Sequence, residues 1–213
     1  TPTPSSAASD VYKRQPVDLS VGGMSGHIFR RLFHLAMCFL PILYFEFGES
    51  FANYLGISLD ETVATVVIIA AIGEALRLKL GFTVFGQREY ESKQVSALAW
   101  GALAIGMVFL IVPTKEYAYP LILTLTFGDP FMGELRRRGV ESRQVVYYAC
   151  ILVLAIWLAC YYMFSTPLLA CIIVAPIAVL SETPRLRYID DNATMLLIPL
   201  AVVVTLEPFL NVM

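Results

Sequence analysis

The stretch TFGDPFMGELRRRG at residues 126–139 breaks an otherwise apolar part of the chain with acidic and basic side chains. Asp129 follows Gly128 at the end of the apolar run, and Glu134 and the triplet Arg136–Arg138 come after Gly133, which permits close backbone approach. Carboxylate and phosphate oxygens can share one Mg²⁺ ion, and arginine binds phosphate oxygens bidentately. The stretch therefore favours a metal and phosphate site, although the arginine triplet alone is equally typical of a cytoplasmic loop.

A second group of acids lies in SETPRLRYIDDNATMLLIPL, between two apolar segments near the C-terminus. Glu182 opens this group, and Asp190, Asp191 and Asn192 close it. These acids could complete a metal site. Asp191 or Asn192 could instead serve only as the N-cap of the following helix, because Asp and Asn are favoured there.

Two further polar groups precede these. In RRLFH, Arg31 and His34 lie three residues apart and so share one helix face, either in a polar pocket or as an interfacial anchor. Glu74 and Arg77 lie one turn apart near the end of the apolar run VVIIAAIGEALRL, and the charged stretch 88–93 follows. An acid inside a span is costly unless paired or hydrated. A local Glu74–Arg77 pair and a polar functional pocket both meet that requirement.

The elements that carry these groups are predicted from composition. Hydrophobic residues make up 58% of the chain and charged residues only 15%, with a mean hydropathy of +0.70. Soluble domains contain about 45–50% apolar and about 25% charged residues. The excess is more than one core of this size could bury, so lipid is the simplest solvent for it. The sequence predicts an all-α, polytopic integral membrane helical bundle.

Segments of about 17–25 mostly apolar residues are long enough to span a bilayer. The main reading is about seven transmembrane helices, with six as the alternative, because one segment is short and only STP separates two others. The predicted spans are 28–47, 62–80, 95–112, 117–128, 144–164, 166–180 and 193–210.

The basic residues predict the orientation of these spans. Fourteen of the fifteen Lys and Arg lie in the N-terminal flank up to Arg31 or in residues 77–94, 128–143 and 181–192, and Lys115 is the exception. Short cytoplasmic loops are enriched in Lys and Arg. The N-terminus is therefore predicted to be cytoplasmic, and the four polar groups share the cytoplasmic face. The net charge of −2 gives no indication of a nucleic-acid partner.

Other motifs exclude several classes of site. The four cysteines lie in apolar runs without CxxC spacing, which favours ordinary buried or lipid-facing thiols. Walker A, GxGxxG, HExxH and GxSxG patterns are absent from the sequence. Residues 1–23 are polar and lack a signal-peptide core. They are predicted to be a tail that is disordered or not native, and residues 24–213 a single transmembrane domain.

In their order along the chain, these segments resemble the dolichol kinase/phytol kinase family of integral-membrane polyprenol kinases. The resemblance covers most of residues 27–205 and rests on RRLFH, on Glu74-x-x-Arg77 followed by REYESKQVSALAWG, on GDPFMGELRRRG and on SETPRLRYIDDNATMLLIPL. It implies transfer of a phosphoryl group from a nucleoside triphosphate, typically CTP, to the terminal hydroxyl of an isoprenoid alcohol such as dolichol, phytol or geranylgeraniol. The protein would then be a compact archaeal- or bacterial-type member in the cell membrane, with its active site facing the cytoplasm.

The resemblance also implies roles for individual residues. Asp129, Asp191 and Glu182 would be catalytic, with Asp129 and Asp191 holding Mg²⁺ and Glu182 orienting or deprotonating the alcohol. The nucleotide would be bound by Gly128, Gly133, Arg136, Arg137, Arg88, Lys93 and Asn192. A supporting polar pocket would contain Arg31, His34, Glu74 and Arg77.

Two other functions remain open. A CTP-dependent cytidylyltransferase that makes a CDP-lipid would also have a Gly-Asp segment, but its late signature contains His, and both histidines here lie before residue 35. The loop after Gly128-Asp129 is shorter than in eukaryotic dolichol kinases and relies on Arg instead of Lys, which leaves the choice of nucleotide open. A non-enzymatic membrane carrier would place ionisable groups in mid-membrane, where only Glu74 is a candidate.

Overall fold

The computed structural model describes residues 20–183, 186 and 189–210, and within this part of the chain the regular elements are helices. One isolated β-bridge joins Ser20 to Arg88. The prediction of an all-α protein is confirmed for these residues. Residues 1–19 of the predicted tail lie outside the described residues. Of its last residues, which the structure describes, Val21 donates a 2.8 Å hydrogen bond from its amide to the Gln87 carbonyl.

The elements follow one another along the chain with short connections. They are α2 (Gly23–Ala36), α3 (Phe39–Ile42), the π-helical turn η1 (Leu43–Phe47), α4 (Gly48–Leu55), α5 (Leu59–Leu80), the 3₁₀ turn η2 (Glu89–Lys93), α6 (Ala97–Ile111), α7 (Lys115–Arg137), α8 (Ser142–Phe164), α9 (Leu168–Leu180) and α10 (Asp191–Leu210). Each of the seven predicted ranges overlaps one of these helices or the run from α2 to α4.

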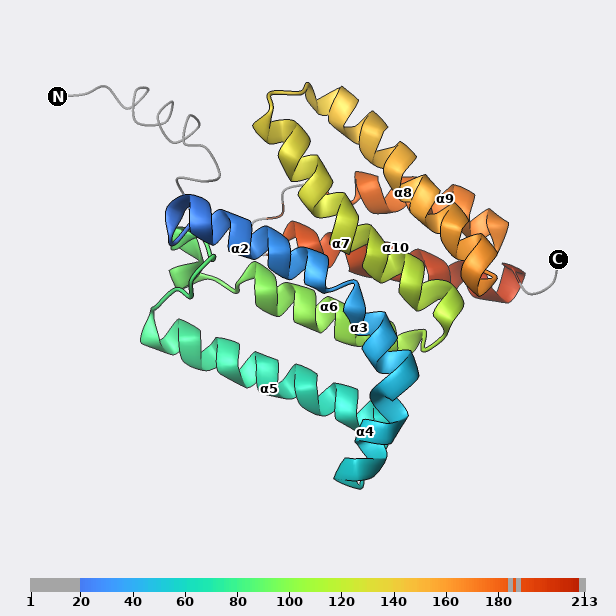
Figure 1. Cartoon of the computed structure of the whole chain (residues 1–213), viewed down its shortest axis with the longest axis horizontal. Helices are drawn as coiled ribbons and strands as arrows, with labels where there is room; N and C mark the ends of the chain where they lie inside the picture. Colours follow the sequence, from blue (N-terminus) through green and yellow to red (C-terminus); the bar gives the residue numbers. More distant parts are fainter. Residues whose placement is uncertain (1–19, 184–185, 187–188, 211–213) are drawn as a thin grey trace.

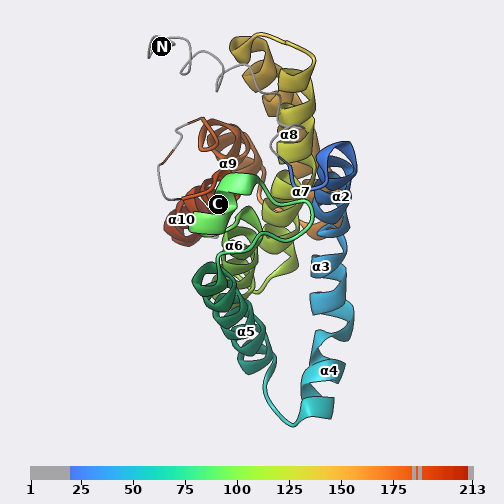
Figure 2. The same cartoon turned by 90° about the vertical axis from the view of Figure 1, so that its left-hand side faces the viewer.

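Helix α7 is the centre of the bundle, in contact with α8, α10, α2, α3, α6 and α9 (Figure 1). Helix α6 lies between α10 and α5, and α5 is the outermost helix on its side (Figure 2). The largest fully buried side chains lie on α7, α8 and α10 and include Leu121, Leu125, Trp157 and Met195. The Trp157 indole nitrogen donates to the Thr124 hydroxyl at 2.9 Å, which satisfies two polar groups inside this core.

Local sequence fixes where α5 begins and ends. Ser58 and Glu61 form a capping box, in which the Ser58 hydroxyl accepts from the Glu61 amide and the Glu61 carboxylate accepts from the Ser58 amide. Gly81 ends the helix with a φ of 69°, a left-handed conformation that costs glycine little. The chain then returns through η2 to the start of α6.

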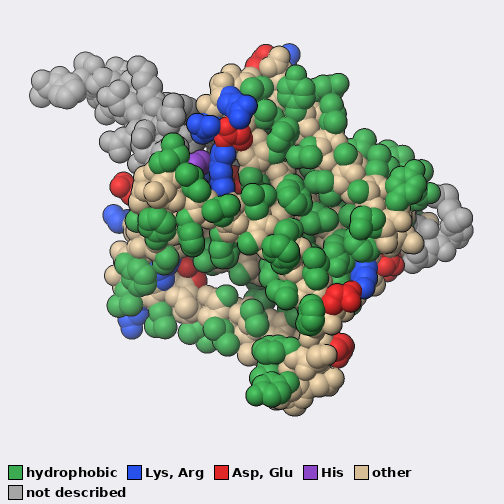
Figure 3. Space-filling view, viewed as in Figure 1, with side chains coloured by type: hydrophobic (Ala, Val, Ile, Leu, Met, Phe, Trp, Pro, Cys, Tyr) green, Lys and Arg blue, Asp and Glu red, His purple; other side chains and the backbone are tan. Residues whose placement is uncertain are grey.

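Within the part of the chain that the structure describes, three helical segments are long and apolar enough to cross a membrane by length and composition: Gly23–Leu55, Ser142–Phe164 and Asp191–Phe209. Helices α6 and α9 are shorter apolar helices. Exposed hydrophobic side chains cover much of the surface (Figure 3), including Ile68, Ile69 and Ile72 on the outer face of α5. Contiguous exposed apolar surface of this kind suits contact with lipid.

The predicted end of the fourth span is wrong in one respect. The sequence suggests that the apolar helix stops at Gly128-Asp129 and that a loop follows, whereas α7 continues without interruption to Arg137. Pro130 lacks an N–H group, so it leaves the Thr126 carbonyl without its helical donor but does not end the helix. The charged residues from Asp129 to Arg137 therefore have helical spacing.

Candidate metal and phosphate site

Three carboxylates from distant parts of the sequence meet at one end of the bundle. Asp129, Glu182 and Asp191 each offer an oxygen, and these oxygens lie within 4.8 Å of one another. We call these residues the acid cluster. They are the three residues predicted to be catalytic, and the structure brings them together.

Asp129 projects from α7, which packs closely on its neighbours at this level. A Cβ atom added to Gly128 would lie 3.3 Å from the Met195 Cε atom of α10 and 3.5 Å from a Val153 methyl carbon of α8. The glycine therefore permits close helix packing just before Asp129. These packing contacts give no direct support to the predicted role of Gly128 in binding nucleotide.

Asp191 occupies the first turn of α10. The cap of that helix is Asp190, whose backbone carbonyl accepts from the Ala193 amide and whose carboxylate accepts from the Asn192 amide at 3.1 Å. Burial, and then the negative charge of Asp191, raise the pKa of Asp190 to about 7. Because Asp190 makes the cap, neither Asp191 nor Asn192 is required as the N-cap residue of α10.

Glu182 lies in the turn that follows α9, and its side chain is only 1% exposed. Its two oxygens accept from the two terminal nitrogens of Arg136, in a bidentate ion pair. Burial raises the pKa of Glu182, and Arg136 opposes that effect. Arg136 therefore lies at the acid cluster, as predicted.

His34 approaches the acid cluster from α2. Its Nδ1 atom lies 3.4 Å from the Asp129 Oδ2 atom, but the geometry is not that of a hydrogen bond. Asn192, which is 1% exposed, donates its side-chain amide to the Ala97 carbonyl at 3.4 Å. Its Oδ1 atom is buried without a partner among the described residues, as is the Thr126 hydroxyl one turn before Asp129.

This arrangement suits a divalent cation. Two carboxylates 4.8 Å apart repel each other by about 3 kcal/mol at an effective dielectric constant of about 20. One arginine, Arg136, makes an ion pair within the acid cluster among the described residues, so negative charge remains in excess. Hard divalent cations such as Mg²⁺ prefer carboxylate, carbonyl and water oxygens. The donor set and the unpartnered buried polar atoms nearby fit such an ion.

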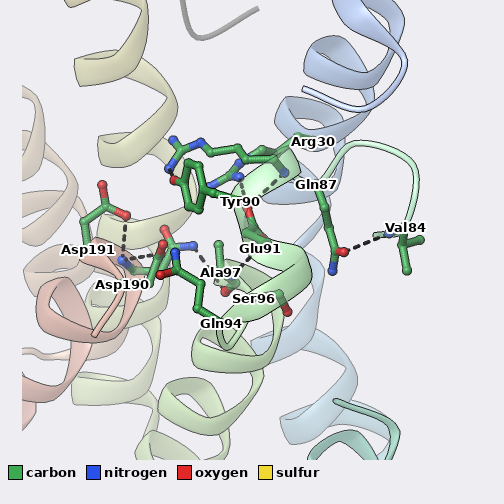
Figure 4. Close-up of polar contacts among 12 residues, drawn as sticks. Arg30, Val84, Gln87, Tyr90, Glu91, Gln94, Ser96, Ala97, Asp190 and Asp191 are labelled. Carbon is green, nitrogen blue, oxygen red and sulfur yellow. Dashed lines mark hydrogen bonds and ion pairs between the residues drawn. The ribbon is translucent and has the colours of Figure 1, made fainter. Parts of the chain in front are cut away.

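A second cation, Arg88, stands beside the aspartates without a close carboxylate partner. Its side chain donates to the Tyr90 hydroxyl, and the described residues include no ion pair for it. Burial acts to lower the pKa of Arg88, but Tyr90, Asp191 and Asp190 outweigh it and raise the pKa. In the view of Figure 4, Tyr90 lies between Arg30 and the two aspartates, Asp190 and Asp191. An arginine with unused donors beside a metal site is well suited to a phosphate group.

Sequence reasoning missed two residues next to this site, Glu91 and its ion-pair partner Arg30. Glu91 is 2% exposed and accepts from Arg30 at 3.1 Å, from the Arg88 amide at 3.1 Å and from the Ala97 amide at 3.3 Å (Figure 4). It therefore joins α2, η2 and the start of α6. Glu91 caps the Arg88 amide, but the sequence signature of such a cap has Ser or Thr three residues before the Glu, so REYESKQ lacks that signal.

The structure places Glu74 and Arg77 in a structural role. Arg77 donates to both Glu74 oxygens at 2.8 and 2.7 Å, and to the carbonyls of Phe82 and Gln94. Glu74 also accepts from the amide and hydroxyl of Ser96. Both carboxylate oxygens and the three Arg77 nitrogens are thus paired, so the group ties the end of α5 to the start of α6. This supports the local-pair reading over the polar-pocket reading.

The remaining predicted residues do not contact the acid cluster. Arg31 and Arg137 both pair with Glu134, and Gly133 lies beside the Arg31 guanidinium. Lys93 is exposed, with no side-chain partner among the described residues. Arg185 and Arg187 fall outside the described residues. The predicted site is therefore brought together in part: its three acids, Arg136, His34 and Asn192 gather, with Arg88 nearby.

No protein-family model, curated protein or solved structure matches this chain.

Proposed function

We propose that the protein is a membrane-embedded lipid kinase that transfers the γ-phosphoryl group of CTP, or another nucleoside triphosphate, to the terminal hydroxyl of an isoprenoid alcohol. The acid cluster of Asp129, Glu182 and Asp191 is the observation that carries this proposal. Three carboxylates from separate elements, with Arg136 in contact and Arg88 nearby, suit a complex of a divalent cation with phosphates. The resemblance in motif order to polyprenol kinases supplies the reaction class.

The proposed topology has seven membrane-spanning segments and a cytoplasmic N-terminus, in the cell membrane of an archaeon or bacterium. The distribution of Lys and Arg along the chain supports this orientation. In it, the acid cluster faces the cytoplasm, where nucleotide is available. The apolar chain of the alcohol would lie in the bilayer among the helices, and only its hydroxyl would reach the acid cluster.

The residues of this chain would divide the work as follows. Asp129 and Asp191 would hold Mg²⁺, which when bound neutralises phosphate charge. Arg136 and Arg88 would bind phosphate oxygens and stabilise the charge of the transition state, because phosphoryl transfer depends mainly on positioning and electrostatics. The Asn192 backbone amide, which donates to the carboxylates of Asp190 and Asp191, would fix their positions, and His34 would lie beside Asp129.

The reaction itself balances without a further reactant. The alcohol oxygen forms a bond to the γ-phosphorus, and the bond from the γ-phosphorus to the oxygen it shares with the β-phosphorus breaks. Glu182 would orient the hydroxyl and accept its proton. Burial raises the pKa of Glu182 above its ordinary value, which is the direction that favours a carboxylate accepting a proton. The products are the phosphorylated alcohol, CDP and a proton.

The deciding experiment incubates purified protein with Mg²⁺, isoprenoid alcohols of several lengths, and CTP labelled in either the γ- or the α-phosphate. The proposal expects the γ-label on the alcohol and release of CDP. Asp129→Asn should lower the rate by about 100-fold or more, whereas Asp60→Asn, an exposed acid at the start of α5, should leave it unchanged. ATP, GTP and UTP labelled in the γ-phosphate are tested in parallel.

Two results would contradict the proposal. Incorporation of the α-label together with release of pyrophosphate would identify a cytidylyltransferase. Absence of transfer from every nucleotide to every alcohol, in protein that still binds a divalent cation, would show that the acid cluster serves another reaction or none.

A further inference from the structure

A second charged group lies next to the acid cluster but makes no contact with it. Glu134 of α7 accepts from Arg31 of α2 at 2.5 Å, from Arg137 at 2.7 and 2.9 Å, and from Arg138 at 2.9 Å. We call these four residues the arginine–Glu134 cluster. A single carboxylate thus holds three guanidinium groups together.

The charge of this cluster is not balanced. Three arginines and one glutamate give a net charge of +2, and the cluster contacts no other acid among the described residues. Arg138 uses only its Nε atom for Glu134, so both of its terminal nitrogens remain available, and its side chain is 69% exposed. Arg137 is 37% exposed. Free, exposed guanidinium groups held in fixed positions are suited to bidentate binding of a phosphate.

A nearby histidine adds a further polar group. His27 lies one turn before Arg31 on α2, and its Nε2 atom is buried without a hydrogen-bond partner among the described residues. Figure 3 shows blue and red side chains gathered with a purple histidine, over the end of α7 and the adjoining part of α2.

The cluster lies where an apolar surface meets a polar one. Arg31 belongs to the helical run Gly23–Leu55, which is apolar and long enough to span a membrane, and the next such helix begins at Ser142, soon after Arg138. Ile28 and Leu35, three residues before and four residues after Arg31 on the same face of α2, are exposed hydrophobic side chains. Apolar side chains that face lipid next to exposed arginines define the level of the lipid headgroups.

Helix geometry separates this cluster from the acid cluster. Successive residues of an α-helix are rotated by about 100°, so Arg136 points to Glu182 while Arg137 and Arg138 turn to Glu134. Two of the three consecutive arginines are therefore directed away from the candidate active site.

We propose that the arginine–Glu134 cluster binds the phosphate of an anionic lipid headgroup in the leaflet at this end of the bundle. The net charge of +2 attracts the anion, the free nitrogens of Arg138 and Arg137 bind its oxygens, and the exposed Ile28 and Leu35 side chains of α2 contact its acyl chains. This binding is independent of the proposed kinase activity, so either can fail without the other.

The test measures lipid retention by the purified full chain with native mass spectrometry, using phosphatidylglycerol and phosphatidylcholine with identical acyl chains. The unmodified protein is expected to retain phosphatidylglycerol in preference. An arginine near an anionic surface contributes a factor of about five to binding. Arg138→Gln should therefore weaken retention about fivefold, and Arg137→Gln with Arg138→Gln about 30-fold. The control is Arg143→Gln, an exposed arginine of α8 with no ion pair among the described residues.

Three outcomes would overturn the proposal. The first is equal retention of the two lipids by the unmodified protein. The second is an equal loss in Arg138→Gln and Arg143→Gln, which would indicate a nonspecific effect of total charge. The third is displacement of phosphatidylglycerol by millimolar inorganic phosphate, which would indicate a site for soluble phosphate.

Discussion

Replacing Asp129 with asparagine should make the cation-free protein more stable. The change removes one of three carboxylates whose oxygens lie within 4.8 Å of one another. Asp129 takes part in two repulsive pairs, each about 3 kcal/mol at an effective dielectric constant of about 20. The Asp129 side chain is 23% exposed and Glu182 is already paired with Arg136, so most of this repulsion is screened. We expect a net gain of about 1–3 kcal/mol, since functional sites commonly reduce stability.

The same substitution should remove the stabilisation that a divalent cation provides. A ligand present at 100 times its dissociation constant stabilises the folded state by about 2.7 kcal/mol. For a chain of this size, 1 kcal/mol corresponds to a change in Tm of about 2–4 °C. The unmodified protein should therefore gain about 5–10 °C on addition of saturating Mg²⁺ or Mn²⁺, and Asp129→Asn should gain little.

The assay is thermal unfolding of detergent-purified protein in EDTA and in a series of Mg²⁺ or Mn²⁺ concentrations. Asp60→Asn serves as the matched control, because Asp60 is an exposed acid in the first turn of α5. The reasoning would be refuted if Asp129→Asn were less stable than the unmodified protein in EDTA and still showed the full cation-dependent increase in Tm.

Three further substitutions test the surrounding structure. Glu74→Gln leaves the buried Arg77 without its carboxylate, which costs about 3–5 kcal/mol; its Tm should fall while its cation response stays intact, and Glu89→Gln, at an exposed acid, is the control. Gly128→Val should cost about 1–3 kcal/mol by overpacking, measured by the same unfolding assay, and an unchanged Tm would contradict the close helix packing. Arg136→Gln leaves Glu182 buried and unpaired, so it should lower both Tm in EDTA and the rate of phosphoryl transfer; an unchanged rate would exclude the phosphate-binding role.

Much of the fold could be predicted because long apolar helices leave a simple pattern in the sequence. Each predicted apolar range overlaps a helix or a helical run in the structure, since length and hydropathy alone identify such segments. The meeting of Asp129, Glu182 and Asp191 was also expected, because groups at the same end of successive antiparallel helices share one face. The seven-span topology remains a proposal, because three segments of the described residues meet the length and composition criteria for a span.

The individual partners could not be predicted from composition. Asp129 and Arg136 are seven residues apart, which is close to two helical turns and places them on one face, but only if the helix continues through Pro130. Ending the apolar span at Gly128-Asp129 removed that information. In the same way, the pairing of Glu74 with Ser96 joins residues 22 positions apart, and no local pattern in the sequence specifies such a contact.

The continuity of α7 from Asp129 to Arg137 also determines which mutations this segment can tolerate. Substituting a single arginine alters one of the two charged groups and leaves the other in place. Inserting or deleting one residue after Asp129 would rotate every later side chain by about 100°. Arg136 would then lose Glu182, and Glu134 would lose Arg31, in a single event. Deep mutational scanning should therefore find this segment far more tolerant of point substitutions in Arg137 and Arg138 than of any change in its length.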